Sequence, residues 1–256
     1  MHQVLLERDG PVWTLTLNDE RRRNALDLVM RERLRDALAT AMADDRCRSI
    51  VLTGAGGTFC AGGDLATMPT DRPESGRPRL AVIAEITRLL LCGAKPVVAA
   101  VEGFAYGAGL SLAAASDHVV AASDARLCCS FGKVGLIADT GLLWTLPQRV
   151  GIGRTKELLF FASVLNAHQA HGHGLVDAIT EPGDTLAEAH RRAAILAAAA
   201  PGPIAETKRV LAAWPATLDE VLADEADTQV RLFGSADFAE GRPAFFDKRP
   251  ARFLGH

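Results

Sequence analysis

The chain lacks two features that would place it with nucleic acid or with membranes: an excess of positive charge and a long apolar run. Its 28 Lys and Arg residues are outnumbered by 31 Asp and Glu residues, which gives a net charge of −3. A general nucleic-acid binder needs a broad basic surface, so that class is excluded. The longest apolar region, residues 97–115, contains Glu102 and several glycines, and it therefore predicts no membrane span.

Cysteine is also scarce, with five residues in the whole chain. Their odd number and their spacing fit neither a disulfide framework nor a zinc site, so reduced thiols are predicted. His168, His171 and His173 cluster with only Asp177 nearby to complete a metal set, and we interpret them as surface residues, with no metal site. Because acidic residues stand near the N-terminus, where a signal peptide would be apolar, a cytoplasmic protein is predicted.

The composition, with 48% hydrophobic and 23% charged residues, is typical of a globular protein. Apolar strand-like runs alternate with turns and helical periods, which predicts the α/β class. The predicted strands are 4–7, 12–17, 49–53, 97–101 and 118–121, and the predicted helices are 28–42, 80–91, 109–115, 142–149, 155–162 and 186–200. Residues 69–78 are predicted to form a loop. Prolines at 201 and 203 are predicted to end the core helices, which divides the chain into a core (1–200) and a helical oligomerisation region (201–256).

Two glycine-rich turns, each after an apolar run, are the most informative feature of the chain. Residues 49–64 read SIVLTGAGGTFCAGGD, and residues 96–111 read PVVAAVEGFAYGAGLS. Glycine lets the backbone turn sharply and lets another group approach its N–H closely. Two such turns can aim two backbone donors at one point, which is an arrangement that stabilises an oxyanion formed during a reaction.

Side chains in and after these turns have competing interpretations. Ser111 partly matches the Gly-x-Ser-x-Gly elbow of an acyl hydrolase, although the missing second glycine favours a structural serine. Asp64 and Asp139 each lie in a loop before a helix, where aspartate is most often a helix cap. Residues 54–57 lack the third glycine of the dinucleotide fingerprint, so no such site is predicted.

Seven short segments carry a family resemblance. They are NALD at 24–27, FCAGGD at 59–64, KPVVAAVEG at 95–103, GAG at 107–109, LPQRVG at 146–151, GLVD at 174–177 and FDKR at 246–249. In this order and spacing the chain resembles the enoyl-CoA hydratase/isomerase (crotonase) family from end to end. The resemblance implies a spiral of repeated ββα units and a C-terminal helical region that builds a homotrimer or a dimer of trimers. It also implies an acyl-CoA substrate, with coenzyme A as part of the thioester and no tightly bound cofactor.

The resemblance further implies an oxyanion hole made by the N–H groups of Gly63 and Ala108. At the positions of the two glutamates that the family's hydratases use, this chain has Ser111 and Phe131. Phenylalanine cannot transfer a proton, and serine is a poor acid or base for the hydration reaction. Asp139 falls where some family isomerases place a catalytic aspartate. Since one carboxylate is enough to move a double bond, the prediction is an enoyl-CoA isomerase with Asp139 as the proton shuttle. An enoyl-CoA hydratase, an acyl-CoA thioester hydrolase and a non-catalytic acyl-CoA-binding protein remain open as alternatives.

The resemblance also implies where the acyl-CoA contacts the protein. Relatives grip the nucleotide end of coenzyme A just before the NALD segment, and their C-terminal tail can reach the phosphate of a neighbouring subunit's ligand. The predicted substrate and CoA contacts are Arg22, Arg23, Ala25, Ala61, Gly63, Asp64, Leu65, Tyr106, Ala108, Ser111, Phe131, Leu136, Phe245 and Lys248.

Overall fold

The protein is built on a six-stranded sheet, and the computed structural model describes residues 3–69, 71–213 and 216–255. The strand order is β1-β2-β3-β4-β6-β9, in which β1 and β2 pair antiparallel and the other neighbours pair parallel. The strands are β1 (Val4–Asp9), β2 (Val12–Leu17), β3 (Ser49–Gly54), β4 (Val97–Val101), β6 (His118–Ala122) and β9 (Ala178–Thr180). A second sheet contains β5 (Phe104–Tyr106), β7 (Arg126–Cys128) and β8 (Leu165–Asn166). The predicted α/β class is confirmed.

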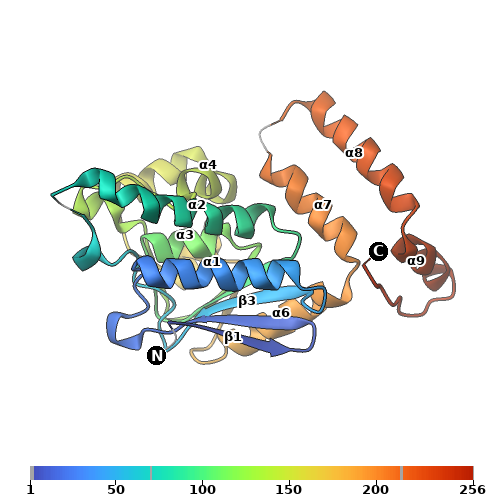
Figure 1. Ribbon diagram of the computed structural model, residues 1–256, viewed down its shortest axis with the longest axis horizontal. Helices are drawn as coiled ribbons and strands as arrows, with labels where there is room; N and C mark the ends of the chain where they lie inside the picture. Colours follow the sequence, from blue (N-terminus) through green and yellow to red (C-terminus); the bar gives the residue numbers. More distant parts are fainter. Residues whose placement is uncertain (1–2, 70, 214–215, 256) are drawn as a thin grey trace.

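Helices cover both faces of the large sheet (Figure 1). The helices of the first 200 residues are α1 (Leu28–Ala43), α2 (Arg77–Cys92), α3 (Ala108–Ala115), α4 (Leu142–Phe161), α5 (Ala167–Gly172) and α6 (Thr185–Ala198). α1 to α4 lie on one side, whereas α6 packs Ala189, Ala193 and Ala197 against the other. All five residues of β4 are buried, which explains its continuous apolar sequence, because parallel strands are covered on both faces.

Three further helices continue the chain away from the sheet (Figure 1). They are α7 (Pro201–Ala212), α8 (Leu218–Phe233) and α9 (Ala236–Phe246). α7 is tied to the core by Lys208, which is buried, donates to the Leu90 carbonyl oxygen at 2.9 Å and pairs with Asp117. In the part of the chain that is described, no helix has the length and apolar character needed to cross a bilayer.

Three element boundaries differ from the sequence prediction. Pro201 begins α7 instead of closing the preceding helix, because proline fits the first helical position, where its missing N–H is not needed. The two helices predicted at 142–149 and 155–162 are joined as α4, with Gly151 at a non-helical φ of 74° between them. The predicted loop at 69–78 contains a 3-10 helix at Pro73–Gly76, and α2 begins directly after it.

Candidate active site

The first glycine turn leads from β3 to a short 3-10 helix at Leu65–Thr67. A Cβ atom on Gly54 would lie 2.2 Å from the Thr58 carbonyl oxygen, so the chain can fold back here only with glycine. Gly62 has a φ of 106°, which residues with a side chain rarely adopt. The turn places Gly63, the next residue, on the wall of a cavity.

The second turn runs from β4 through β5 into α3 and packs on the first through the backbone. Gly107 precedes the first residue of α3 at φ 50° and ψ −120°, outside the helical region. A Cβ atom on Gly62 would lie 2.8 Å from the Tyr106 carbonyl oxygen and 3.7 Å from the Ala108 nitrogen. The structure therefore brings the two turns together, as expected from their sequences.

Cys60 joins the two turns. Its N–H donates to the Phe104 carbonyl oxygen at 2.9 Å, and its carbonyl oxygen accepts from the Tyr106 N–H at 3.0 Å. Burial raises the pKa of the Cys60 thiol to about 12. The thiol is therefore neutral and acts as a small apolar side chain, because the thiolate is the nucleophilic form.

Between the turns lies a cavity of about 140 Å³. Gly63 and Ala108 both line it, and the N–H of neither residue donates a hydrogen bond to another described residue. Backbone N–H groups that lack a partner in a preorganised site are available to a developing oxyanion. The full lining is Arg31, Ala61, Gly62, Gly63, Leu65, Met68, Gly107, Ala108, Ser130, Phe131, Lys133, Val134, Leu136 and Asp139.

Asp139 is the carboxylate of this lining. It lies in the loop before α4, is half-buried, and accepts a 2.9 Å hydrogen bond at Oδ1 from the Thr140 hydroxyl. The side chain does not cap α4, whose N-cap position is Gly141. One carboxylate oxygen is thus held by a neighbour, while the side chain borders the space between the two turns.

Ser111 and Phe131, which the resemblance places at the hydratase glutamate positions, occupy different places. Phe131 lies in the 3-10 helix Ser130–Val134, is 9% exposed and lines the cavity. Ser111 is fully buried inside α3, and its hydroxyl donates to the Gly107 carbonyl oxygen at 3.2 Å. Ser111 is not part of the cavity lining, so its hydroxyl serves the helix.

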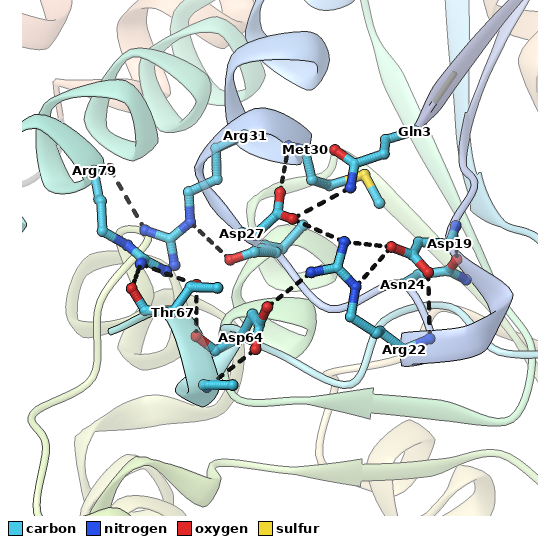
Figure 2. A network of polar contacts seen from close by, with 12 residues as sticks. Gln3, Asp19, Arg22, Asn24, Asp27, Met30, Arg31, Asp64, Thr67 and Arg79 are labelled. Atoms are coloured by element: carbon cyan, nitrogen blue, oxygen red, sulfur yellow. Dashed lines mark hydrogen bonds and ion pairs between the residues drawn. The ribbon is translucent and has the colours of Figure 1, made fainter. Parts of the chain in front are cut away.

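Arg22 lies at the centre of a network of three aspartates (Figure 2). Its guanidinium contacts Asp19 at 2.5 Å, Asp27 at 2.8 Å and Asp64 at 2.9 Å. These hydrogen bonds and charges raise the pKa of Arg22 above its ordinary value. Asp64 also accepts from the Ala66 N–H at 3.1 Å as the N-cap of the 3-10 helix, which agrees with the capping interpretation. The positive charge of Arg22 is therefore neutralised within the chain.

Asp27 in this network gives a testable pH dependence. Burial alone would favour its neutral form, but hydrogen bonds from the Met30 N–H, Gln3 and Arg22 lower the pKa of Asp27 below 3.8. Because Asp27 is the N-cap of α1, Asp27→Ala is expected to lower the free energy of unfolding by about 1–2 kcal/mol at neutral pH. The pKa is lower in the folded state, so this contribution is present above the unfolded pKa and is lost as pH falls through the folded value. Urea unfolding of both proteins over an acid series measures it.

Asp36→Ala, on the exposed face of the same helix, is the matched control and is expected to cost less than about 0.5 kcal/mol. An Asp27→Ala penalty that stayed constant down to the most acidic pH would contradict the role assigned to the ionised carboxylate.

The remaining predicted contacts divide into two groups. Ala61, Leu65 and Leu136 line the cavity together with the residues described above. Arg22, Arg23, Ala25, Asp64, Tyr106, Phe245 and Lys248 do not. Phe245 is 80% exposed on α9, which lies away from the sheet in this chain (Figure 1). Its role and that of Lys248 stay predictions.

Sequence reasoning missed Arg31, which is 2% exposed and lines the cavity from α1. A signal was present: Arg31 precedes Leu34 by three residues and Leu38 by seven, which places a charge on the apolar stripe of the helix. Met68 and Ser130 were also missed, and nothing in their sequence context distinguishes them.

A larger hollow of about 750 Å³ lies between α4, α6 and α7. It contains none of the predicted site residues. Among the residues that are described, no group of three or more His, Cys, Asp or Glu side chains is arranged to bind a metal ion. The small cavity between the turns is therefore the candidate active site, with backbone donors and a carboxylate as its chemical groups.

Known proteins resemble this chain along nearly its whole length. The model of the enoyl-CoA hydratase/isomerase family matches residues 7–256. The chain is 38% identical to the 1,2-epoxyphenylacetyl-CoA isomerase of Escherichia coli K12, over 100% of this chain and 99% of that protein. It is 31% identical to the crotonyl-CoA hydratase of Syntrophomonas wolfei, over 98% and 97% of the two chains.

Solved structures show the same fold. An enoyl-CoA hydratase from Polaromonas sp. JS666 superposes with a TM-score of 0.93 at 36% identity, covering 98% of this chain and 99% of that one. An enoyl-CoA hydratase from Bacillus anthracis gives 0.94 at 28% identity, covering 99% and 100%. The fold and the two-turn site define a crotonase-type acyl-CoA enzyme. The chain belongs to the enoyl-CoA hydratase/isomerase family, and the predicted crotonase fold is confirmed.

Proposed function

We propose that the protein moves the double bond of an enoyl-CoA, with Asp139 carrying the proton. The observation that supports this most strongly is that Asp139 is the one carboxylate among the described residues of the cavity, which also presents the Gly63 and Ala108 N–H groups. Phe131 occupies the lining where a hydratase would need a second proton-transfer group.

The reaction follows from these groups. With a 3-enoyl-CoA, the Asp139 carboxylate removes a proton from the carbon next to the thioester, and the negative charge spreads over a dienolate. The two N–H groups stabilise the charge on the thioester oxygen. Asp139 then returns a proton two carbons further along the chain, which gives the conjugated 2-enoyl-CoA. The Phe131 ring helps to exclude water from the cavity, which strengthens the interaction between the oxyanion and its donors.

An assay with two substrates tests the proposal. The purified protein is expected to convert 3-hexenoyl-CoA to 2-hexenoyl-CoA, followed by the ultraviolet absorbance of the conjugated thioester. It is expected not to add water to crotonyl-CoA, followed by loss of the same absorbance. Water addition without isomerisation would instead establish a hydratase, as the names of several relatives suggest.

Two other outcomes would also contradict isomerisation. Release of free thiol from an acyl-CoA would indicate a hydrolase, although the buried, hydrogen-bonded Ser111 hydroxyl makes that serine a poor nucleophile. Thermal stabilisation by acyl-CoA without turnover of any substrate would indicate a binding protein.

The assembly is part of the proposal. Exposed apolar side chains on the C-terminal helices include Val230, Phe233, Phe245 and Phe246. Burying such side chains against a neighbouring subunit is favourable. We therefore propose that residues 201–256 form the contact of a homotrimer, alone or as a dimer of trimers, and we retain the cytoplasmic location and the absence of a tightly bound cofactor as predictions.

A further inference from the structure

Two arginines are buried beside the candidate active site on helices that pack together. Arg31 on α1 is 2% exposed, and Arg79 on α2 is 8% exposed. Figure 2 shows their guanidinium groups close to each other. Buried arginines are normally paired with a carboxylate, so their partners need to be identified.

All the observed partners are uncharged. Arg31 donates from Nε to the Leu26 carbonyl oxygen at 3.2 Å and from Nη1 to the Arg79 carbonyl oxygen at 3.5 Å. Arg79 donates from Nη1 to the carbonyl oxygen and the hydroxyl of Thr67. The Nη2 atom of Arg79 is buried without a hydrogen-bond partner among the described residues. Neither guanidinium forms an ion pair with a carboxylate of the described residues, in contrast to Arg22, which has three.

The two positive charges therefore repel each other in a region that is shielded from water. Burial and the neighbouring charge of Arg79 lower the pKa of Arg31, while the negative charge of Asp139 partly offsets them. An arginine side chain keeps its proton in proteins, so the charge remains. Removing a charge from water is unfavourable unless an opposite charge faces it. This region thus carries more positive charge than Asp139 alone can balance.

Arg31 faces the cavity. It is part of the lining, and its Nη2 atom lies 3.3 Å from the position that a Cβ atom on Gly63 would take. This Nη2 forms no hydrogen bond with the described residues, in contrast to Nε and Nη1. The wall beside the proposed Gly63 donor therefore presents a charged N–H group, Arg31 Nη2, that has no hydrogen-bond partner among the described residues.

We propose that Arg31 binds a carboxylate carried by the acyl chain, so that the substrate is the CoA thioester of a dicarboxylic acid. The inference rests on the acyl-CoA chemistry proposed above and names its substrate class. The planar guanidinium fork matches a carboxylate in geometry and charge. A hydrocarbon acyl chain would instead press an apolar group against a desolvated cation. The charge of Arg79 adds to that of Arg31 on this side of the cavity.

Lys133 also lines the cavity, but it is exposed to solvent and can attract any negatively charged group of an acyl-CoA. The test therefore compares two ligands that share the whole CoA portion. Glutaryl-CoA and pentanoyl-CoA have acyl chains of equal length and differ only in a terminal carboxylate or methyl group. Any attraction between Lys133 and the CoA phosphates is the same for both ligands, so it cancels in the ratio of the two affinities.

Titration calorimetry on the purified protein measures both affinities. We expect glutaryl-CoA to bind at least about tenfold more tightly than pentanoyl-CoA. The reason is that a buried hydrogen bond between the terminal carboxylate and the charged guanidinium contributes more than the bonds to water that both groups lose. Arg31→Met is expected to weaken glutaryl-CoA binding by about 10- to 100-fold and to leave pentanoyl-CoA within about threefold. Arg31→Lys, which keeps the charge but loses the fork, is expected to give an intermediate ratio.

Arg33→Met removes the same charge from the exposed face of α1 and is expected to change neither affinity by more than about twofold. Arg31→Met is expected to unfold at a temperature no lower than the parent protein, because it removes a buried charge that has no carboxylate partner in the described part of the chain. Equal affinities in the parent protein, or an equal loss for both ligands in Arg31→Met and Arg31→Lys, would overturn the inference. Both ligands lack a double bond, so these outcomes do not depend on isomerase activity; failure to bind either ligand would contradict the proposed function itself.

Discussion

The Asp139→Asn enzyme is expected to lose isomerase activity, with kcat for 3-enoyl-CoA falling about 100- to 10,000-fold. Asparagine has nearly the same size and can still accept the hydrogen bond that Thr140 donates to Oδ1. It cannot take a proton from the substrate carbon. The two N–H donors remain, so substrate binding is retained and KM changes little, which is the pattern of an interaction made in the transition state.

Steady-state kinetics and hydrogen exchange test this expectation together. Incorporation of deuterium from heavy water next to the thioester reports the first proton transfer even when no product forms, and it is expected to fall with kcat. Asp124→Asn, a carboxylate in the exposed turn between β6 and β7, is the matched control and is expected to leave both rates unchanged. Undiminished activity in Asp139→Asn would assign the proton transfer to another group.

The parts of the fold that the sequence predicts correctly are those with a strong local signal. Residues 97–101 form a continuous apolar run, and the structure buries all of them in a parallel strand. The short strands β5, β7 and β8 have two or three residues each, too few for an alternating pattern to be recognised. Yet β5 supplies the backbone groups that bind Cys60 and hold the two turns together. Their position depends on long-range pairing, which no local window contains.

The same distinction applies to the site. Glycines at 62 and 107 mark the turns because their backbone conformations suit no other residue well. Arg31 is different, since an arginine on a helix is usually interpreted as a surface residue. The role proposed for Arg31 depends on its contact with Arg79, 48 positions later, and on its proximity to Gly63 in the first glycine turn. Only the packed structure shows that the Arg31 guanidinium faces the cavity and has no carboxylate partner among the described residues.

The two glycine turns pack so closely at Gly109 that a side chain there is expected to disturb both of them. Gly109 follows Ala108, the second proposed oxyanion donor, and a Cβ atom on Gly109 would lie 2.4 Å from the Cys60 carbonyl oxygen and 2.7 Å from the Cys60 Cβ. These are backbone and near-backbone atoms, which cannot rotate away. Gly109→Ala is therefore expected to push the start of α3 away from the first turn and to separate the two N–H groups. The expected cost is about 1–3 kcal/mol in the free energy of unfolding.

The catalytic effect of Gly109→Ala is expected to exceed its effect on binding. Misaligning one oxyanion donor lowers kcat by about 100- to 1,000-fold, because the charge on the thioester oxygen develops only during the reaction. Gly153→Ala is the matched control: Gly153 lies within α4, and a Cβ atom there meets nothing within 4 Å. That variant is expected to gain up to about 1 kcal/mol of stability and to keep full activity. A Gly109→Ala protein that is less stable but has unchanged kcat would show that the oxyanion is stabilised without the close contact of the two turns.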